Sequence, residues 1–183
     1  PIPIAGKRML VFDRNQTWRT VLREFCYQWR CGFGEAANTG EVVQMLRQAK
    51  VVGVKYDFLL LDSQADEVVG TDFVRALREE FGSEPKIVVL ASKARPGDAR
   101  LLQEAGCNGY LTKPVHRKRL YDTLCLVLAA GGAKELVTRH VVAEEQKLRR
   151  AILVVDDNET NRKVVSSMLT RSGFACVLAE SGE

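Results

Sequence analysis

The chain has 183 residues, 46% of them hydrophobic, and a formal net charge of +4. This length and apolar content predict one well-buried domain with some chain left over, and leave little room for two complete domains. The sequence opens without a Met or an apolar leader, and none of its apolar runs approaches the roughly 20 residues of a membrane helix. We therefore expect a soluble fragment of a longer protein, with no membrane contact of its own.

Cysteine spacing and charge distribution narrow the classes of protein further. The five cysteines are scattered and none is spaced as CxxC, so neither a disulfide framework nor a zinc site is favoured, and a reducing cytoplasm is expected. The 27 basic residues are interspersed with 23 acidic ones instead of forming a stripe with aromatic side chains. Nucleic acid is therefore not an expected partner.

Short apolar runs alternate with segments of helical period over residues 1–130. This alternation predicts an α/β fold with a doubly wound, five-stranded parallel sheet. The expected strands are "RMLVF" at 8–12, a weaker one at 34–36, "FLLLD" at 58–62, "KIVVLA" at 86–91 and "GYLT" at 109–112. Five helices are expected between and after them, each with an apolar face, such as Leu101, Leu102 and Ala105 in the fourth.

After residue 130 the pattern breaks and then restarts. Residues 131–150 contain paired glycines and a charged run, and we interpret them as a linker. A strand at 151–155, a helix at 161–171 and a strand at 175–179 then follow, so that "ILVVDDNETNR" aligns with "MLVFDRNQTWR" near the start. In this alignment Asp156 falls on Asp13, whereas Asp157 falls on Arg14. We expect residues 151–183 to be the opening βαβ unit of a second copy.

Three motifs in this order and at this spacing resemble those of the receiver domain of response regulators. They are the acidic loop after the first strand, "LLLDSQADEVVG" after the third and "GYLTKP" after the fifth. The resemblance implies a flavodoxin-like receiver fold and transfer of a phosphoryl group from a phosphohistidine to Asp62. It also implies a phosphate contact at Lys113, a switch aromatic at Tyr110 and Mg²⁺ held by an acid pair. Simple packing is an equal alternative for Tyr110.

The tandem arrangement resembles the C-terminal region of a hybrid sensor histidine kinase, and the first copy departs from the receiver pattern. Its acid pair is Asp13 followed by Arg14, and a guanidinium cannot be a metal ligand. We expect Arg14 to pair with the carboxylates of Asp13 and Asp62, although a solvent-facing Arg14 is the simpler alternative. The second copy keeps both acids, so Mg²⁺ is expected for a complete second receiver, at Asp156 and Asp157, and not for the first.

A second departure concerns the family's hydroxyl residue after the fourth strand. Spacing from Asp62 and to Lys113 puts this position at Ala91, which has no hydroxyl. Ser92 is adjacent and takes the position if the register slips by one residue. Together the two departures predict a pseudo-receiver, which is a domain with the receiver fold that does not accept a phosphoryl group.

Three functions follow from these observations. The first is a regulatory, non-enzymatic pseudo-receiver that docks on the kinase core or on the second receiver of the same chain. The second is an ordinary phosphoacceptor at Asp62 that tolerates Arg14. The third is a sensor of an anionic nucleotide, with the basic residues Arg95, Arg100, Arg117, Lys118 and Arg119 as its ligand face. We also expect the truncated second unit to form homo-oligomers; a membrane anchor in the parent kinase is left open.

Overall fold

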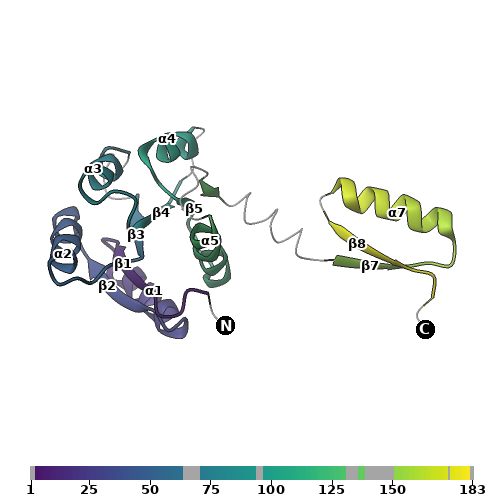
Figure 1. Ribbon diagram of the computed structural model, residues 1–183, viewed down its shortest axis with the longest axis horizontal. Helices are drawn as coiled ribbons and strands as arrows, with labels where there is room; N and C mark the ends of the chain where they lie inside the picture. The colour runs from purple at the N-terminus through teal and green to yellow at the C-terminus, as the bar shows by residue number, and fades with distance from the viewer. Residues whose placement is uncertain are drawn as a thin grey trace. The chain divides into compact units, whose positions relative to one another are not determined.

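The computed structural model describes residues 3–63, 71–93, 97–130, 136–138, 151–172 and 174–181. The chain divides into two compact units, residues 1–138 and 139–183, and each is described by itself (Figure 1). Most of the predicted linker, residues 139–150, lies outside the described residues.

The first unit is built on a parallel sheet with the strand order β2-β1-β3-β4-β5-β6. Its strands are β1 (Arg8–Phe12), β2 (Gly32–Ala36), β3 (Phe58–Asp62), β4 (Lys86–Ala91), β5 (Gly109–Thr112) and β6 (Val137–Thr138). Strands β1, β3 and β4 are buried along almost their whole length, which explains their continuous apolar sequences. The doubly wound α/β fold predicted from the sequence is confirmed.

Helices cover both faces of this sheet, with α2, α3 and α4 on one side and α1 and α5 on the other (Figure 1). They are α1 (Gln16–Gln28), α2 (Thr39–Val51), α3 (Thr71–Phe81), α4 (Asp98–Ala105) and α5 (Arg117–Ala129). The side chains of Asn15 and Asn38 cap α1 and α2 by accepting hydrogen bonds from first-turn backbone N–H groups. None of the described helices has both the length and the hydropathy needed to cross a membrane.

The apolar face of α4 is narrower than the sequence predicts. Leu102 and Ala105 are buried in the core, as expected, but Leu101 is 49% exposed. Leu101 and Leu102 are about 100° apart around the helix axis, so Leu101 lies at the edge of the apolar face.

The short strand β6 extends the first unit beyond the predicted boundary at residue 130. It pairs in parallel with β5, with Val137 opposite Gly109, and Leu136 and Val137 are buried. The prediction of five strands and of a linker beginning at residue 131 therefore missed this strand. Two residues beside a charged segment carry no periodicity, so the sequence gives no signal for it.

The second unit consists of β7 (Ala151–Val155), α7 (Glu159–Arg171) and β8 (Ala175–Ala179). Its two strands pair in parallel, from Ala151 opposite Ala175 to Val155 opposite Ala179, in the strand–helix–strand order that the sequence predicts. Many of its apolar side chains are exposed, among them Leu153, Val155, Val164, Met168, Val177 and Leu178.

We predict that this second unit makes the chain self-associate. A two-stranded sheet with one helix buries too little apolar surface to be stable by itself, and its open strand edges can pair with another copy. Light scattering should give a mass that rises with concentration for the full chain and stays monomeric for a chain ending at Thr138. Leu153→Lys, at a position that is 62% exposed in β7, should lower the mass of the full chain. A full chain that remains monomeric at every concentration would contradict this prediction.

Candidate functional site

Two buried carboxylates meet at the carboxyl edge of the first sheet. Asp62 is the last residue of β3, and Asp13 directly follows β1. Strands β1 and β3 are neighbours, with Phe12 opposite Leu61, so the two acids emerge side by side. Their exposed fractions are only 1% for Asp13 and 3% for Asp62. The edge therefore holds two acidic side chains that are shielded from water.

The ammonium group of Lys113 lies between these carboxylates. Its Nζ is 2.8 Å from Asp13 Oδ2 and 2.9 Å from Asp62 Oδ1. The backbone N–H of Lys113 donates to the Ala91 carbonyl at 2.7 Å, and the ammonium lies 5.8 Å from the centre of the Trp18 ring. One partly buried cation thus bridges the ends of β1 and β3 from a position just after β5.

The loop after β1 is fixed by hydrogen bonds of its own. Asp13 Oδ1 accepts the backbone N–H of Asn15 at 2.8 Å, and the guanidinium of Arg19 donates to the Asp13 carbonyl at 2.6 Å. Arg19 also lies 3.5 Å from a carboxylate oxygen of Glu35. Arg19 was not predicted as a site residue. Its alignment with Arg162 in the second copy is the sequence feature that points to it.

These residues do not fit a resident Mg²⁺ ion. Magnesium prefers oxygen ligands in octahedral geometry. Among the described residues two carboxylates meet here, and one oxygen of each faces the Lys113 ammonium. Over the described ranges of the chain there is no group of three or more His, Cys, Asp or Glu side chains that could hold a metal.

Arg14 has an exposed side chain directly after Asp13. The cation that the structure brings between Asp13 and Asp62 is Lys113. Pairing of Arg14 with the same two carboxylates stays a prediction.

The register of β4 puts Ala91 at the end of the strand. Leu90 lies opposite Asp62 of β3, and Ala91 lies opposite Thr112 of β5. Ser92 is the first residue after the strand; its Oγ is buried and makes no hydrogen bond within the described part of the chain. Leaving a buried hydroxyl without a hydrogen bond costs about 1–3 kcal/mol of stability. The Ser92 hydroxyl is therefore available to accept or donate a hydrogen bond at the end of β4.

Tyr110 of β5 is buried in the core cluster that also contains Ala91 and Leu102. Burial raises the pKa of its hydroxyl, and the Asp98 carboxylate at the start of α4 raises it further. The Tyr110 side chain is therefore part of the core, and only 8% of the residue is exposed. A role of Tyr110 as a switch stays a prediction.

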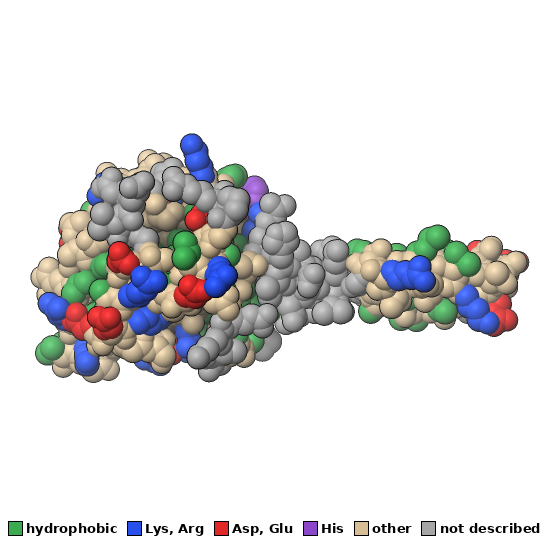
Figure 2. Space-filling model, turned by 90° about the horizontal axis from the view of Figure 1, so that it is seen from above, with side chains coloured by type: hydrophobic (Ala, Val, Ile, Leu, Met, Phe, Trp, Pro, Cys, Tyr) green, Lys and Arg blue, Asp and Glu red, His purple; other side chains and the backbone are tan. Residues whose placement is uncertain are grey.

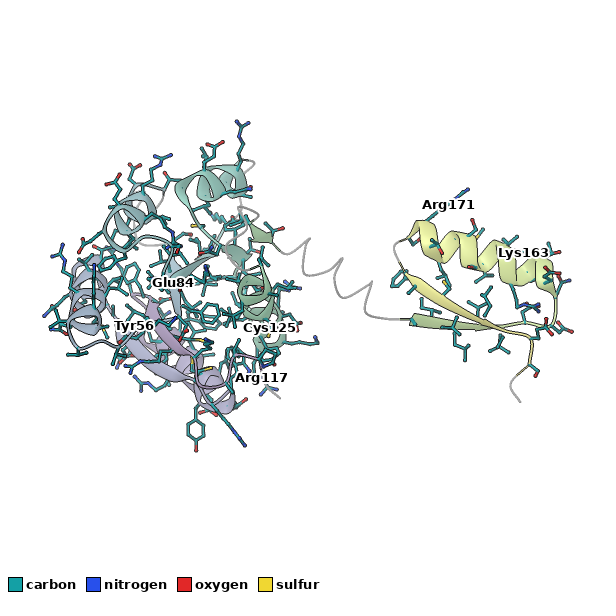
Figure 3. All side chains as sticks on the ribbon, in the orientation of Figure 1. Tyr56, Glu84, Arg117, Cys125, Lys163 and Arg171 are labelled. Atoms are coloured by element: carbon teal, nitrogen blue, oxygen red, sulfur yellow. The ribbon has the colours of Figure 1, made fainter. Side chains whose placement is uncertain are left out.

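The predicted basic ligand face is largely paired within the protein. Arg100 lies 2.8 Å from Glu104 and Lys118 lies 2.8 Å from Asp122, both as exposed pairs four residues apart on a helix. Arg117, labelled in Figure 3 at the start of α5, hydrogen bonds to Gln28 of α1. Arg119 follows in α5, and Arg95 lies outside the described residues.

The charges on the surface of the first unit are mixed. On the face seen in Figure 2, basic and acidic side chains alternate without forming a stripe of one sign. This agrees with the charge pattern of the sequence and gives the nucleotide-sensor interpretation little support.

The second unit repeats the loop geometry of the first. Asp156 Oδ1 accepts the backbone N–H of Asn158 at 2.8 Å, and Arg162 donates to the Asp156 carbonyl at 2.6 Å. Arg162 also pairs with Glu180 at 2.9 Å, as Arg19 does with Glu35. Asp157 is exposed beside Asp156, in the place that Arg14 takes in the first unit.

A doubly wound parallel sheet with two acids and a lysine at its carboxyl edge defines a receiver-type signalling domain. Residues 9–125 match the family described as the response regulator receiver domain. The chain belongs to this family, and the resemblance predicted from its motifs is confirmed.

Similar proteins include kinases that carry receiver domains. The chain is 28% identical over 155 residues to histidine kinase 3 of Arabidopsis thaliana, covering 77% of this chain and 14% of that protein. It is 28% identical over 131 residues to hybrid signal transduction histidine kinase I of Dictyostelium discoideum, covering 67% of this chain and 8% of that protein. The chain thus spans a small part of the length of these kinases.

A solved structure of a response regulator from Thermotoga maritima matches with a TM-score of 0.60 at 20% sequence identity. The match covers 68% of this chain and 98% of that chain. At this identity the likeness supports the fold and nothing finer.

We predict that Lys113→Met destabilises the protein strongly. Removing one partner of a buried ion pair leaves uncompensated charge, here two carboxylates, and costs about 3–5 kcal/mol. Urea unfolding should show this loss in the free energy of unfolding. The matched control is Lys118→Met, which removes an exposed pair with Asp122 and should change that free energy by less than about 1 kcal/mol. Equal effects of the two substitutions would show that the Lys113 bridge does not stabilise the fold.

Proposed function

We propose that the first unit is a pseudo-receiver: a regulatory domain of a hybrid histidine kinase phosphorelay that acts by docking and does not accept phosphate. The observation that carries this proposal is the Lys113 ammonium, 2.8 Å from Asp13 and 2.9 Å from Asp62. The ammonium engages one oxygen of each carboxylate, and Arg14 stands where the second acid of a metal-binding pair is expected.

The chemistry of the acceptor reaction explains why this arrangement is unfavourable for phosphorylation. A carboxylate that attacks a phosphoryl group must have the repulsion between the two anions neutralised, usually by Mg²⁺. Here Arg14 stands where a second acid is needed, and a guanidinium offers no lone pair to a metal. Ala91 offers no hydroxyl to the transferred group. Lys113 and Asp62 therefore remain paired, and the site keeps one charge state.

The expected partners are the kinase core and the complete second receiver of the same chain. In that second receiver Asp156 and Asp157 would hold Mg²⁺ for phosphoryl transfer. The cytoplasm is the proposed compartment, which the free thiol state of all five cysteines supports. Docking lets a domain with a fixed charge state favour one arrangement of its neighbours, without a reaction of its own.

Beryllofluoride, a mimic of the phosphoryl group, tests this proposal. We predict that millimolar Mg²⁺ with beryllofluoride produces no saturable change in amide shifts or in the fluorescence of Trp18, whose ring lies near Lys113. The matched control is Asp62→Asn, which should respond no differently from the unchanged chain. A saturable response that Asp62→Asn abolishes would overturn the proposal and identify Asp62 as an ordinary phosphoacceptor.

We predict that restoring the reaction needs two substitutions. Arg14→Asp should restore Mg²⁺ binding, because it supplies the missing carboxylate and removes a cation. Phosphorylation by a small phosphodonor should remain poor until Ala91→Thr adds a hydroxyl that can hold the phosphoryl oxygen. Phosphorylation is followed by intact mass. A stable acyl phosphate on Arg14→Asp alone would mean that Ser92 supplies the hydroxyl.

A further inference from the structure

A hollow of about 710 Å³ lies at the amino edge of the first sheet, between the C-terminal ends of α3 and α4. This volume is in the range of sites for small molecules, roughly 300–1,000 Å³. Its polar lining includes Arg78, Ser83, Lys86, Arg100, Glu104 and Asn108. We call it the α3–α4 hollow. Asp62 and Lys113 lie at the opposite edge of the sheet and take no part in it.

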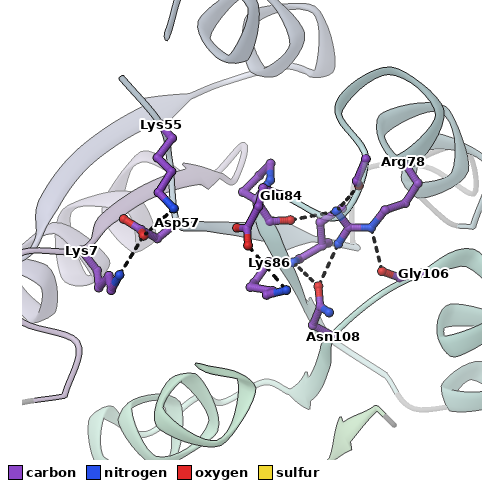
Figure 4. Close-up of polar contacts among 11 residues, drawn as sticks. Lys7, Lys55, Asp57, Arg78, Glu84, Lys86, Gly106 and Asn108 are labelled. Atoms are coloured by element: carbon purple, nitrogen blue, oxygen red, sulfur yellow. Dashed lines mark hydrogen bonds and ion pairs between the residues drawn. The ribbon is translucent and has the colours of Figure 1, made fainter. Parts of the chain in front are cut away.

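Arg78 gives this hollow a partly buried cation that is held in place by hydrogen bonds. Its Nε donates to the Gly106 carbonyl at 2.9 Å, and its Nη1 donates to the carbonyls of Gly82 at 3.0 Å and Pro85 at 2.9 Å (Figure 4). Its Nη2 donates to Asn108 Oδ1 at 2.8 Å. Burial lowers the pKa of the guanidinium, which nevertheless remains charged. All four of these acceptors are neutral, so they orient the guanidinium without cancelling its charge.

Lys86 adds a second cation, which is buried, at the start of β4. The residue is only 8% exposed. Its ammonium is 3.6 Å from Glu84 Oε1, which is longer than a hydrogen bond, and the Glu84 side chain is 46% exposed. Arg78 and Lys86 therefore share one carboxylate that is itself partly in water. At the rim, Arg100 is already balanced by Glu104 at 2.8 Å.

We propose that the α3–α4 hollow binds a small phosphate-bearing molecule, with the phosphate at the Lys86 ammonium and the Ser83 hydroxyl. The nearly buried Lys86 ammonium has a long ion pair with the partly exposed Glu84, so an anion that enters the hollow gives it a second and closer partner. A phosphate has enough negative charge and acceptor oxygens to accept hydrogen bonds from Lys86 and Ser83 together. The positive charge of Arg78 attracts the phosphate without a direct hydrogen bond. The concave shape favours a small molecule over a macromolecular surface.

This site differs from the basic face predicted from the sequence, with which it shares only Arg100. It also does not depend on whether Asp62 accepts phosphate. A ligand in this hollow contacts the ends of α3 and α4. Its binding would therefore affect the position of helices that a docking domain presents to its partners.

The test is a titration of the full chain with inorganic pyrophosphate at constant ionic strength, followed by amide shifts. We expect saturable shifts at Ser83, Gly106 and Cys107, and an affinity at least tenfold weaker in Lys86→Met. Ser83→Ala, at an exposed position that cannot prevent folding, should weaken binding several-fold. Lys118→Met, which removes an exposed lysine of α5, is the matched control and should bind as tightly as the unchanged chain.

A parallel titration with AMP separates the two sources of a phosphate group. Tighter binding of AMP than of inorganic phosphate would assign the hollow to a nucleotide, and equal binding would assign it to a free phosphate. The proposal is overturned if pyrophosphate gives no saturable shifts, or if Lys86→Met and Ser83→Ala bind as the unchanged chain does. It is also overturned if Lys118→Met weakens binding as much as Lys86→Met.

Discussion

The contact between the Lys113 ammonium and the carboxylates of Asp13 and Asp62 is the interaction on which the carboxyl edge of the sheet depends. Two carboxylates that are almost fully buried repel each other, and burial makes each of them costly. The ammonium offsets both effects, and its own position is fixed through the backbone of Ala91. The ends of β1, β3 and β4 are therefore tied to the residue that follows β5.

The loop after the first strand has the same hydrogen bonds in both copies of the repeat, although one residue of it differs. In both copies an aspartate accepts the backbone N–H of the helix-capping asparagine, and an arginine one turn later donates to the aspartate carbonyl. The residue after the aspartate takes no part in these bonds, whether it is Arg14 or Asp157. The loop therefore keeps the same hydrogen bonds whether an arginine or an aspartate follows the first acid.

Much of the fold could be predicted from the sequence, but the central contact of the site could not. The strands at 8–12 and 58–62 match the structure because runs buried on both faces are continuously apolar. Strand β6 was missed because it is defined only by its pairing with β5. The motifs assigned Asp62 and Lys113 to one site, but they did not predict that Lys113, 100 residues from Asp13, contacts both carboxylates. A sequence pattern shows which residues are neighbours along the chain. It does not show which side chains the strand order brings into contact.

The site at one edge of the sheet is positioned by a contact at the other. Asp57, just before β3, accepts the Arg8 backbone N–H at 2.9 Å and the Lys7 ammonium at 3.1 Å, while its own N–H donates to the Arg8 carbonyl at 2.8 Å. These bonds fix the register of β1 against β3 at their amino ends. A slip of one residue would turn every side chain of the strand to the other face. In this register Phe12 lies opposite Leu61, so the residues that follow them, Asp13 and Asp62, come to lie side by side.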